Sequence, residues 1–285
     1  MKKILCPTDF SDTATRAVDY AAYIAKQAGA HLSILHVIHL PIVDTSETAL
    51  VASELLGEQM RDASERLRAE TQHISEKYEA NRGGNFTCDY IVKEALLTDI
   101  TEHLTKNEGY DLVVMGTTGG GNALEELLIG SNTEAVVDNI RCPLLAVPAG
   151  YNLSGIEKII YASDYEPEEI TALREVAEMA GVFNATIDVV HVVKDSTPES
   201  RKRAEQFRSQ LQSEYPDIPM HFQEVVSKHR DDGLKDYFRQ VNGSILAIYR
   251  KEKSFLSELF SQSLADKMTY QAEVPLLVLQ RRRNS

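Results

Sequence analysis

The sequence predicts an α/β protein made of two tandem domains, each built around a parallel sheet with helices on both faces. The chain has 285 residues, about twice the length of an ordinary single domain. Its second half repeats the apolar pattern of its first half. Within each half, short apolar runs alternate with stretches of helical length, which is typical of a doubly wound parallel sheet.

The internal repeat is direct and extends over both halves. Lys3–Phe10 and Lys158–Tyr165 lie 155 residues apart and match in character at every position except the proline. The same offset places Leu35–Ile38 on Val190–Val193, whereas Cys142–Val147 recurs 132 residues on as Val274–Leu279. A period of this length indicates a duplicated domain rather than a solenoid. We therefore expect a first domain at residues 1–150 and a second at residues 151–285.

The elements of the first half follow from apolar periodicity and from the residues that end each run. Pro7 ends the first strand, and Thr8, Asp9 and Ser11 are candidate caps for the helix that follows. Gly29 is placed to end that helix in the left-handed conformation. Strands are expected at residues 3–6, 32–38, 86–92, 111–115 and 144–147, helices at 13–28, 45–78, 99–104 and 124–139, and a flexible loop at 81–85.

Composition and charge exclude several classes of protein. A net charge of −13 disfavours nucleic-acid binding, which needs a basic face, and the basic run Arg281–Arg283 is typical of a solvated tail. The sequence contains no apolar run of signal-peptide or membrane-spanning length. Cys6, Cys88 and Cys142 share no metal-binding spacing, and two of them lie in or beside apolar strand-like runs. We expect a soluble cytoplasmic protein with no metal site and no membrane partner.

A candidate binding site follows from the rule that parallel sheets bind ligands at the carboxyl ends of their strands. Three segments follow strands there: Pro7–Ser11, Ile38–Leu40 and Met115–Gly121. The third is glycine-rich, and Gly130 and Ser131 lie further along; such residues let backbone N–H groups approach a phosphate. Asp9 is an acceptor placed to bind an amine or a ribose hydroxyl. Two other interpretations stay open: the glycines form tight turns, and Asp9 caps the first helix.

These segments resemble the universal stress protein family. The resemblance rests on Pro7–Ser11, Leu35–Val37, Val114–Gly116, the Gly119 to Gly130-Ser131 spacing and Cys142–Val147, and it extends over both halves. It implies two five-stranded, doubly wound domains of the adenine nucleotide α-hydrolase type. The two halves are then expected to pair through their last strands as an intramolecular pseudo-dimer, and further dimerisation of the chain stays open.

The resemblance also implies an ATP site in the first half, with Mg²⁺ or Mn²⁺ on the phosphates. Asp9 and Val37 would hold adenine and ribose, Gly116 and Gly119 would lie along the sugar and phosphates, and Gly130, Ser131 and Asn132 would hold the phosphate chain. The stretch from Gly119 to Gly130 is one residue longer than the family pattern, and counting from Gly120 restores it. The expected nucleotide-binding residues are Pro7, Thr8, Asp9, Val37, Met115, Gly116, Gly119, Gly120, Gly130, Ser131, Asn132 and Thr133.

The second half lacks these glycines. Ala247–Ser254 replaces the glycine loop, Gln262-Ser263 replaces Gly130-Ser131, and Asp164 alone corresponds to Asp9. We therefore predict a degenerate, structural copy that binds no nucleotide.

Other candidate chemistry is sparse. His36 and His191 repeat at equivalent strand positions and are expected to be hydrogen-bonded core residues, while His39 lies near the proposed site. Neither Ser11 nor Ser131 has an evident histidine base, so catalysis is not expected. The apolar spacing within Thr45–Tyr78 predicts core packing, with a groove for a partner as the alternative.

The sequence thus predicts a tandem universal stress protein that binds one ATP per chain in a regulatory or stress-tolerance role. Two alternatives stay open: an interaction module of the same fold without nucleotide, and a slow ATPase. An unidentified protein partner is compatible with each.

Overall fold

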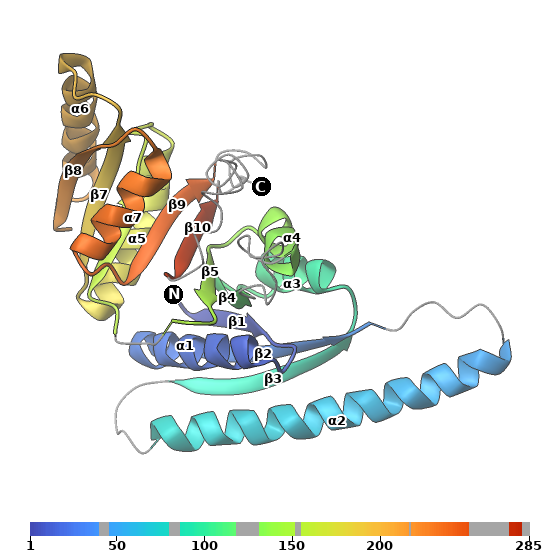
Figure 1. The fold of residues 1–285 in the computed structure, drawn as a ribbon. Helices are drawn as coiled ribbons and strands as arrows, with labels where there is room; N and C mark the ends of the chain where they lie inside the picture. Colours follow the sequence, from blue (N-terminus) through green and yellow to red (C-terminus); the bar gives the residue numbers. More distant parts are fainter. Residues whose placement is uncertain are drawn as a thin grey trace. The chain divides into compact units, whose positions relative to one another are not determined.

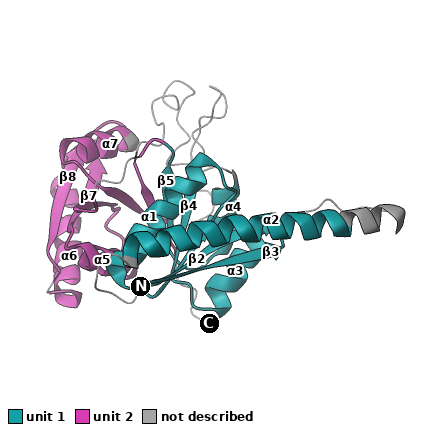
Figure 2. Ribbon diagram, turned by 90° about the horizontal axis from the view of Figure 1, so that it is seen from below, with its two compact units in different colours: residues 1–118, 129–149 teal, residues 119–128, 150–285 magenta. Residues whose placement is uncertain are grey.

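The computed structural model describes residues 1–39, 46–79, 86–117, 131–151, 155–216, 218–250 and 274–280. The described residues form two compact units, with the boundary between residues 149 and 150 (Figure 2). No helix in the described ranges combines the length and the apolar character needed to cross a membrane.

The first unit is a parallel α/β sheet. Its strands are β1 (Lys3–Pro7), β2 (His31–Ile38), β3 (Thr87–Glu94), β4 (Leu112–Thr117) and β5 (Leu144–Pro148), and its helices are α1 (Asp12–Ala28), α2 (Ser46–Glu79), α3 (Leu97–Asn107) and α4 (Ser131–Asn139). The strands are ordered β3-β2-β1-β4-β5 and every pairing between neighbours is parallel. Helices α1 and α2 lie on one side of this sheet and α3 and α4 on the other (Figure 1). The predicted fold class is confirmed.

Individual residues determine where α1 begins and ends. Ser11 is the N-cap, because its side-chain oxygen accepts a hydrogen bond from the Ala14 N–H at 3.2 Å. Gly29 ends the helix in the left-handed conformation with φ 60°, as expected. Between these caps, the apolar stripe of the helix is buried against the sheet.

The second unit repeats this architecture. It contains β6 (Lys158–Ala162), α5 (Glu169–Phe183), β7 (Thr186–Val193), α6 (Pro198–Glu214), β8 (Met220–Val226), α7 (Arg230–Gln240), β9 (Ile245–Arg250) and β10 (Leu276–Gln280). Its strands are ordered β8-β7-β6-β9-β10, again in parallel. In each unit the last strand lies at one edge of that unit's sheet. The pairing of the two halves through these strands stays a prediction.

Backbone details recur at the 155-residue offset. Phe10 and Tyr165 both adopt positive φ, 64° and 59°, in the loop after the first strand of their unit. Gly29 corresponds to Asn184, which ends α5 in the left-handed conformation with φ 53°. The repeat therefore extends to unusual backbone conformations as well as to the apolar pattern.

One of the expectations differs in detail, and others fall outside the described residues. Pro7 is the last residue of β1, in register with Leu35, so the strand ends at this proline as predicted but includes it, because the missing N–H is tolerated at a strand end. The loop at 81–85 lies outside the described residues, as do the glycine loop and residues 251–273. Cys6 and Cys142 are buried and unbridged, as expected.

Helix α2 departs most from expectation. It has 34 residues, whereas α6 of the second unit has 17. Leu67 is fully buried, but Leu55 is 46% exposed, so the predicted core packing holds only for the C-terminal part. Figure 1 shows the reason: the N-terminal part of α2 extends past the carboxyl ends of β2 and β3, where there is no sheet to cover it.

Candidate functional site

A cavity of about 320 Å³ lies at the carboxyl ends of β1, β2 and β4 in the first unit. Eight of the twelve predicted residues line it: Pro7, Thr8, Asp9, Val37, Met115, Gly116, Asn132 and Thr133. Gly119, Gly120 and Gly130 lie outside the described residues, and Ser131 is described only as the first residue of α4. The fold thus brings eight of the predicted residues together at this edge of the sheet.

Asp9 faces this cavity as an anionic acceptor. The Ser11 N–H donates to Asp9 Oδ1 at 3.0 Å, while Ser11 itself caps α1, so the capping role suggested for Asp9 is wrong. Partial burial acts to raise the pKa of the Asp9 carboxyl, but hydrogen bonds from the Ser11 side chain and backbone outweigh this effect. The pKa of Asp9 therefore lies below its ordinary value, and the group is ionised at neutral pH.

Gly116 has a packing reason to lack a side chain. A Cβ at this position would lie 2.7 Å from the Thr13 carbonyl oxygen and 2.9 Å from its carbonyl carbon. The close approach that Gly116 permits is therefore that of β4 to the first turn of α1. Both residues line the cavity.

The phosphate-binding side of the predicted site is formed by the start of α4. Asn132 is exposed, and Thr133 is buried and donates through Oγ1 to the Gly116 carbonyl at 3.5 Å. The free N–H groups of a helix N-terminus favour an anion. Among the described residues, the lining of the cavity contains no lysine or arginine.

Part of the lining was missed from the sequence. Thr13 and Ala14 of α1 line the cavity, as do Ala95, Leu96 and Leu97, which follow β3. The carboxyl-end rule applies to β3 as it does to the other strands, so it could have identified these three residues. Ala14 carries no polar group and gives no signal in a single sequence.

His36 is hydrogen-bonded as predicted, but it is only partly buried and lines the cavity instead of lying in the core. Its Nδ1 lies 2.8 Å from the Thr8 carbonyl oxygen, and its ring stacks on Phe10 at 4.5 Å. In the second unit, His191 Nδ1 lies 2.7 Å from the Ser163 carbonyl oxygen, and its ring stacks on Tyr165 at 4.6 Å. In both cases the acceptor is a carbonyl, so Nδ1 carries the proton.

In the second unit, larger residues stand at the positions equivalent to two residues that line the cavity. Glu169, at the position of Ala14, is 2% exposed. It accepts hydrogen bonds from the Ser163 hydroxyl at 2.5 Å and the Asp164 N–H at 3.0 Å. Asp164 pairs with Arg230 at 2.7 Å, and the buried Tyr249 takes the strand position of Gly116. The polar groups that face a cavity in the first unit are here bonded to protein groups.

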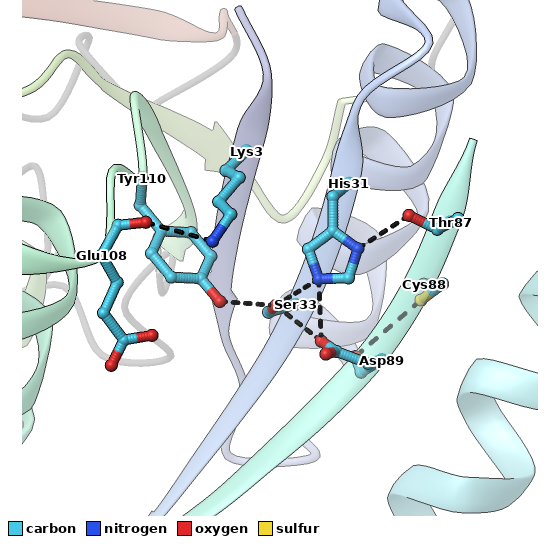
Figure 3. Close-up of polar contacts among 8 residues, drawn as sticks. All are labelled: Lys3, His31, Ser33, Thr87, Cys88, Asp89, Glu108 and Tyr110. Carbon is cyan, nitrogen blue, oxygen red and sulfur yellow. Dashed lines mark hydrogen bonds and ion pairs between the residues drawn. The ribbon is translucent and has the colours of Figure 1, made fainter. Parts of the chain in front are cut away.

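Figure 3 shows a polar cluster that the sequence did not indicate, formed by residues of β2 and β3 with Tyr110. Ser33 donates to Asp89 Oδ1 at 2.6 Å, and Tyr110 donates to Ser33 at 2.7 Å. His31 Nε2 lies 3.1 Å from Ser33 Oγ and 3.3 Å from Asp89 Oδ1. Because serine and aspartate share one histidine nitrogen and Ser33 is fully buried, the cluster lacks the relay of a nucleophilic triad. It links neighbouring strands instead.

Metal binding has no support in the described part of the chain. No group of three or more His, Cys, Asp or Glu side chains is arranged there to hold an ion. A divalent cation at the cavity would therefore need ligand oxygens from a bound molecule.

Comparison with known proteins identifies the fold's relatives. A sequence model of the universal stress protein family matches residues 1–148 and again 155–280. A universal stress protein of Methanocaldococcus jannaschii is 32% identical over 149 residues, covering 51% of this chain and 81% of the relative. The universal stress protein YxiE of Bacillus subtilis is 31% identical over 147 residues, covering 51% and 97%.

A solved structure extends the likeness to the whole chain. The crystal structure of a universal stress protein from Archaeoglobus fulgidus superposes with a TM-score of 0.69 at 17% identity, covering 98% of each chain. At that identity the likeness concerns the fold alone. The two family matches, together with the repeated α/β units, show that this chain belongs to the universal stress protein family and carries its domain twice.

Proposed function

We propose that the first unit binds an adenine nucleotide, ATP with Mg²⁺ or Mn²⁺, and that the chain acts as a nucleotide-dependent regulatory or stress-tolerance protein in the cytoplasm. The observation that carries this proposal is the cavity at the carboxyl ends of β1, β2 and β4, which gathers eight predicted residues from four separate segments. Its volume of about 320 Å³ lies within the range of small-molecule sites.

The lining suggests how the nucleotide is held. Asp9, ionised at neutral pH, accepts from a ribose hydroxyl or the exocyclic amine, while the apolar side chains of Val37, Met115 and Leu97 pack against the base. The start of α4 with Asn132 faces the phosphates. Since the described lining carries no lysine or arginine, the divalent ion supplies the counter-charge that the triphosphate needs.

We further propose one nucleotide per chain. In the second unit Glu169 fills the position of Ala14, and its carboxylate would repel a phosphate or compete with it for donors. Arg230 neutralises Asp164, which removes that carboxylate as a ligand for ribose.

Isothermal titration calorimetry with ATP and Mg²⁺ tests the proposal. We expect one site per chain, an affinity about tenfold or more lower in Asp9→Asn, and no change in the matched variant Asp164→Asn, because hydrogen bonds to a charged group are worth about 1.5–3 kcal/mol. Two sites per chain, or equal effects of the two variants, would contradict the single-site assignment. No binding to folded protein at millimolar ATP would favour the interaction module without nucleotide.

A further inference from the structure

The loop that carries Asp9 contains a strained residue. Phe10, directly after Asp9, has φ 64°, in the left-handed region that costs a residue with a Cβ about 1–2 kcal/mol. Such a conformation persists only where surrounding contacts hold it. The contacts around Phe10 therefore determine where Asp9 points.

Three contacts surround this residue. The Phe10 N–H donates to Thr8 Oγ1 at 3.1 Å, and the Phe10 ring stacks on His36, which is itself bonded to the Thr8 carbonyl. The third contact comes from outside the loop: the guanidinium carbon of Arg66 on α2 lies 4.2 Å from the centre of the Phe10 ring. This is the range of a cation–π interaction.

Arg66 lies between the buried residues Ala63 and Leu67 of α2. Toward its C-terminus the helix buries Leu67, whereas toward its N-terminus it extends past the carboxyl ends of the strands, leaving Leu55 exposed. In the second unit, Tyr165 occupies the place of Phe10 and contacts Phe207 of α6 at 5.3 Å between ring centres. The helix partner of the loop is thus an aromatic ring in the second unit and a cation in the first.

We propose that Arg66 is a positioning residue for nucleotide binding: through the Phe10 ring it holds the Thr8–Ser11 loop in the form that presents Asp9 to the cavity. This inference rests on the proposed adenine-nucleotide site. Arg66 is absent from the cavity lining, so its effect on the ligand passes through Phe10. Its side chain is 55% exposed and lies 3.8 Å from Asp62, so we expect a contribution at the weaker end of the cation–π range.

The experiment measures ATP affinity by calorimetry, with Mg²⁺ present, in the full chain. Arg66→Ala is expected to weaken binding about two- to fivefold. Arg68→Ala, which removes an exposed arginine from the same helix, is the matched control and should leave affinity unchanged. In a Phe10→Gly background, where the left-handed conformation carries no penalty, Arg66→Ala should have no effect.

A second readout is amide hydrogen exchange of residues 9–11 in ligand-free protein, which should accelerate in Arg66→Ala and not in Arg68→Ala. A wild-type chain that binds no ATP overturns the proposed site and this role with it. Normal ATP binding with the same affinity in Arg66→Ala and wild type overturns the positioning role alone, as does an undiminished Arg66→Ala effect in the Phe10→Gly background.

Discussion

Replacing Gly116 with alanine places a methyl group against the first turn of α1. The added Cβ would lie 2.7 Å from the Thr13 carbonyl oxygen, 2.9 Å from its carbonyl carbon and 2.9 Å from its Cγ2, whereas ordinary contacts begin at 3.4 Å. Two of these three atoms belong to the backbone, so α1 or β4 must move by up to about 0.7 Å, and overpacking of this kind costs about 1–3 kcal/mol.

Gly57→Ala is the matched control for this substitution. Gly57 lies within α2, and a Cβ there would meet nothing within 4 Å, so alanine should stabilise the chain by about 0.5–1 kcal/mol through helix propensity. The two glycine-to-alanine changes are thus expected to have opposite signs.

Native-state hydrogen exchange of peptides from the first unit is the suitable assay, because it reports the opening free energy of that unit even if the two units unfold separately. ATP affinity should fall in Gly116→Ala as well, since Gly116 and Thr13 both line the cavity. If Gly116→Ala is as stable as Gly57→Ala, the packing explanation for Gly116 is wrong.

Three further predictions concern the site and its surroundings. Ala14→Glu introduces the residue that the second unit carries at this position and should weaken ATP binding at least tenfold, as measured by calorimetry. The control variant Ala14→Ser should bind ATP nearly as the wild type does. Tight ATP binding by Ala14→Glu would refute the proposal that Glu169 prevents binding in the second unit. Burial, with smaller effects of Asp89 and Glu70, raises the pKa of Cys88 to about 12, so its alkylation rate should still increase about tenfold per pH unit between pH 8 and 11; a plateau near pH 9 would contradict this. Burial likewise raises the pKa of Tyr165 to about 12, above the value in the unfolded chain. The stability that the protonated hydroxyl contributes is therefore complete below pH 10 and is lost as the pH rises toward 12. Comparison of the alkaline unfolding of the wild type and of Tyr165→Phe measures this loss.

The fold was predictable because its signals are local and repeated. Three signals agree on the same architecture: the apolar run of β1, the glycine that ends α1 at Gly29, and the offset of 155 residues between the two halves. The extent of α2 was predicted, but its burial was not. Helical periodicity continues through Leu55, and only the position of the sheet's edge decides that this side chain stays exposed.

The candidate site was predictable where polar or glycine residues mark it. Asp9 and Asn132 carry polar side chains that mark them in the sequence, whereas Ala14 is known as a lining residue only from the folded chain. Gly116 was predicted to lie along the sugar and phosphates of a nucleotide. In the structure, the atoms nearest to a Cβ placed at Gly116 belong to Thr13. Ser11 and Asp9 are equally good caps in sequence, and the start of α1 selects Ser11.

His36 and His191 occupy equivalent positions in the two units, so each unit can serve as a control for the other. His36 and His191 make the same hydrogen bond and the same ring contact, and His36 also lines the cavity of the first unit. Under the proposal of a single nucleotide site in the first unit, loss of His191 measures what this side chain contributes to folding, and loss of His36 measures folding together with any effect on the ligand. The difference between the two variants would then separate the stability of the shared fold from ligand binding.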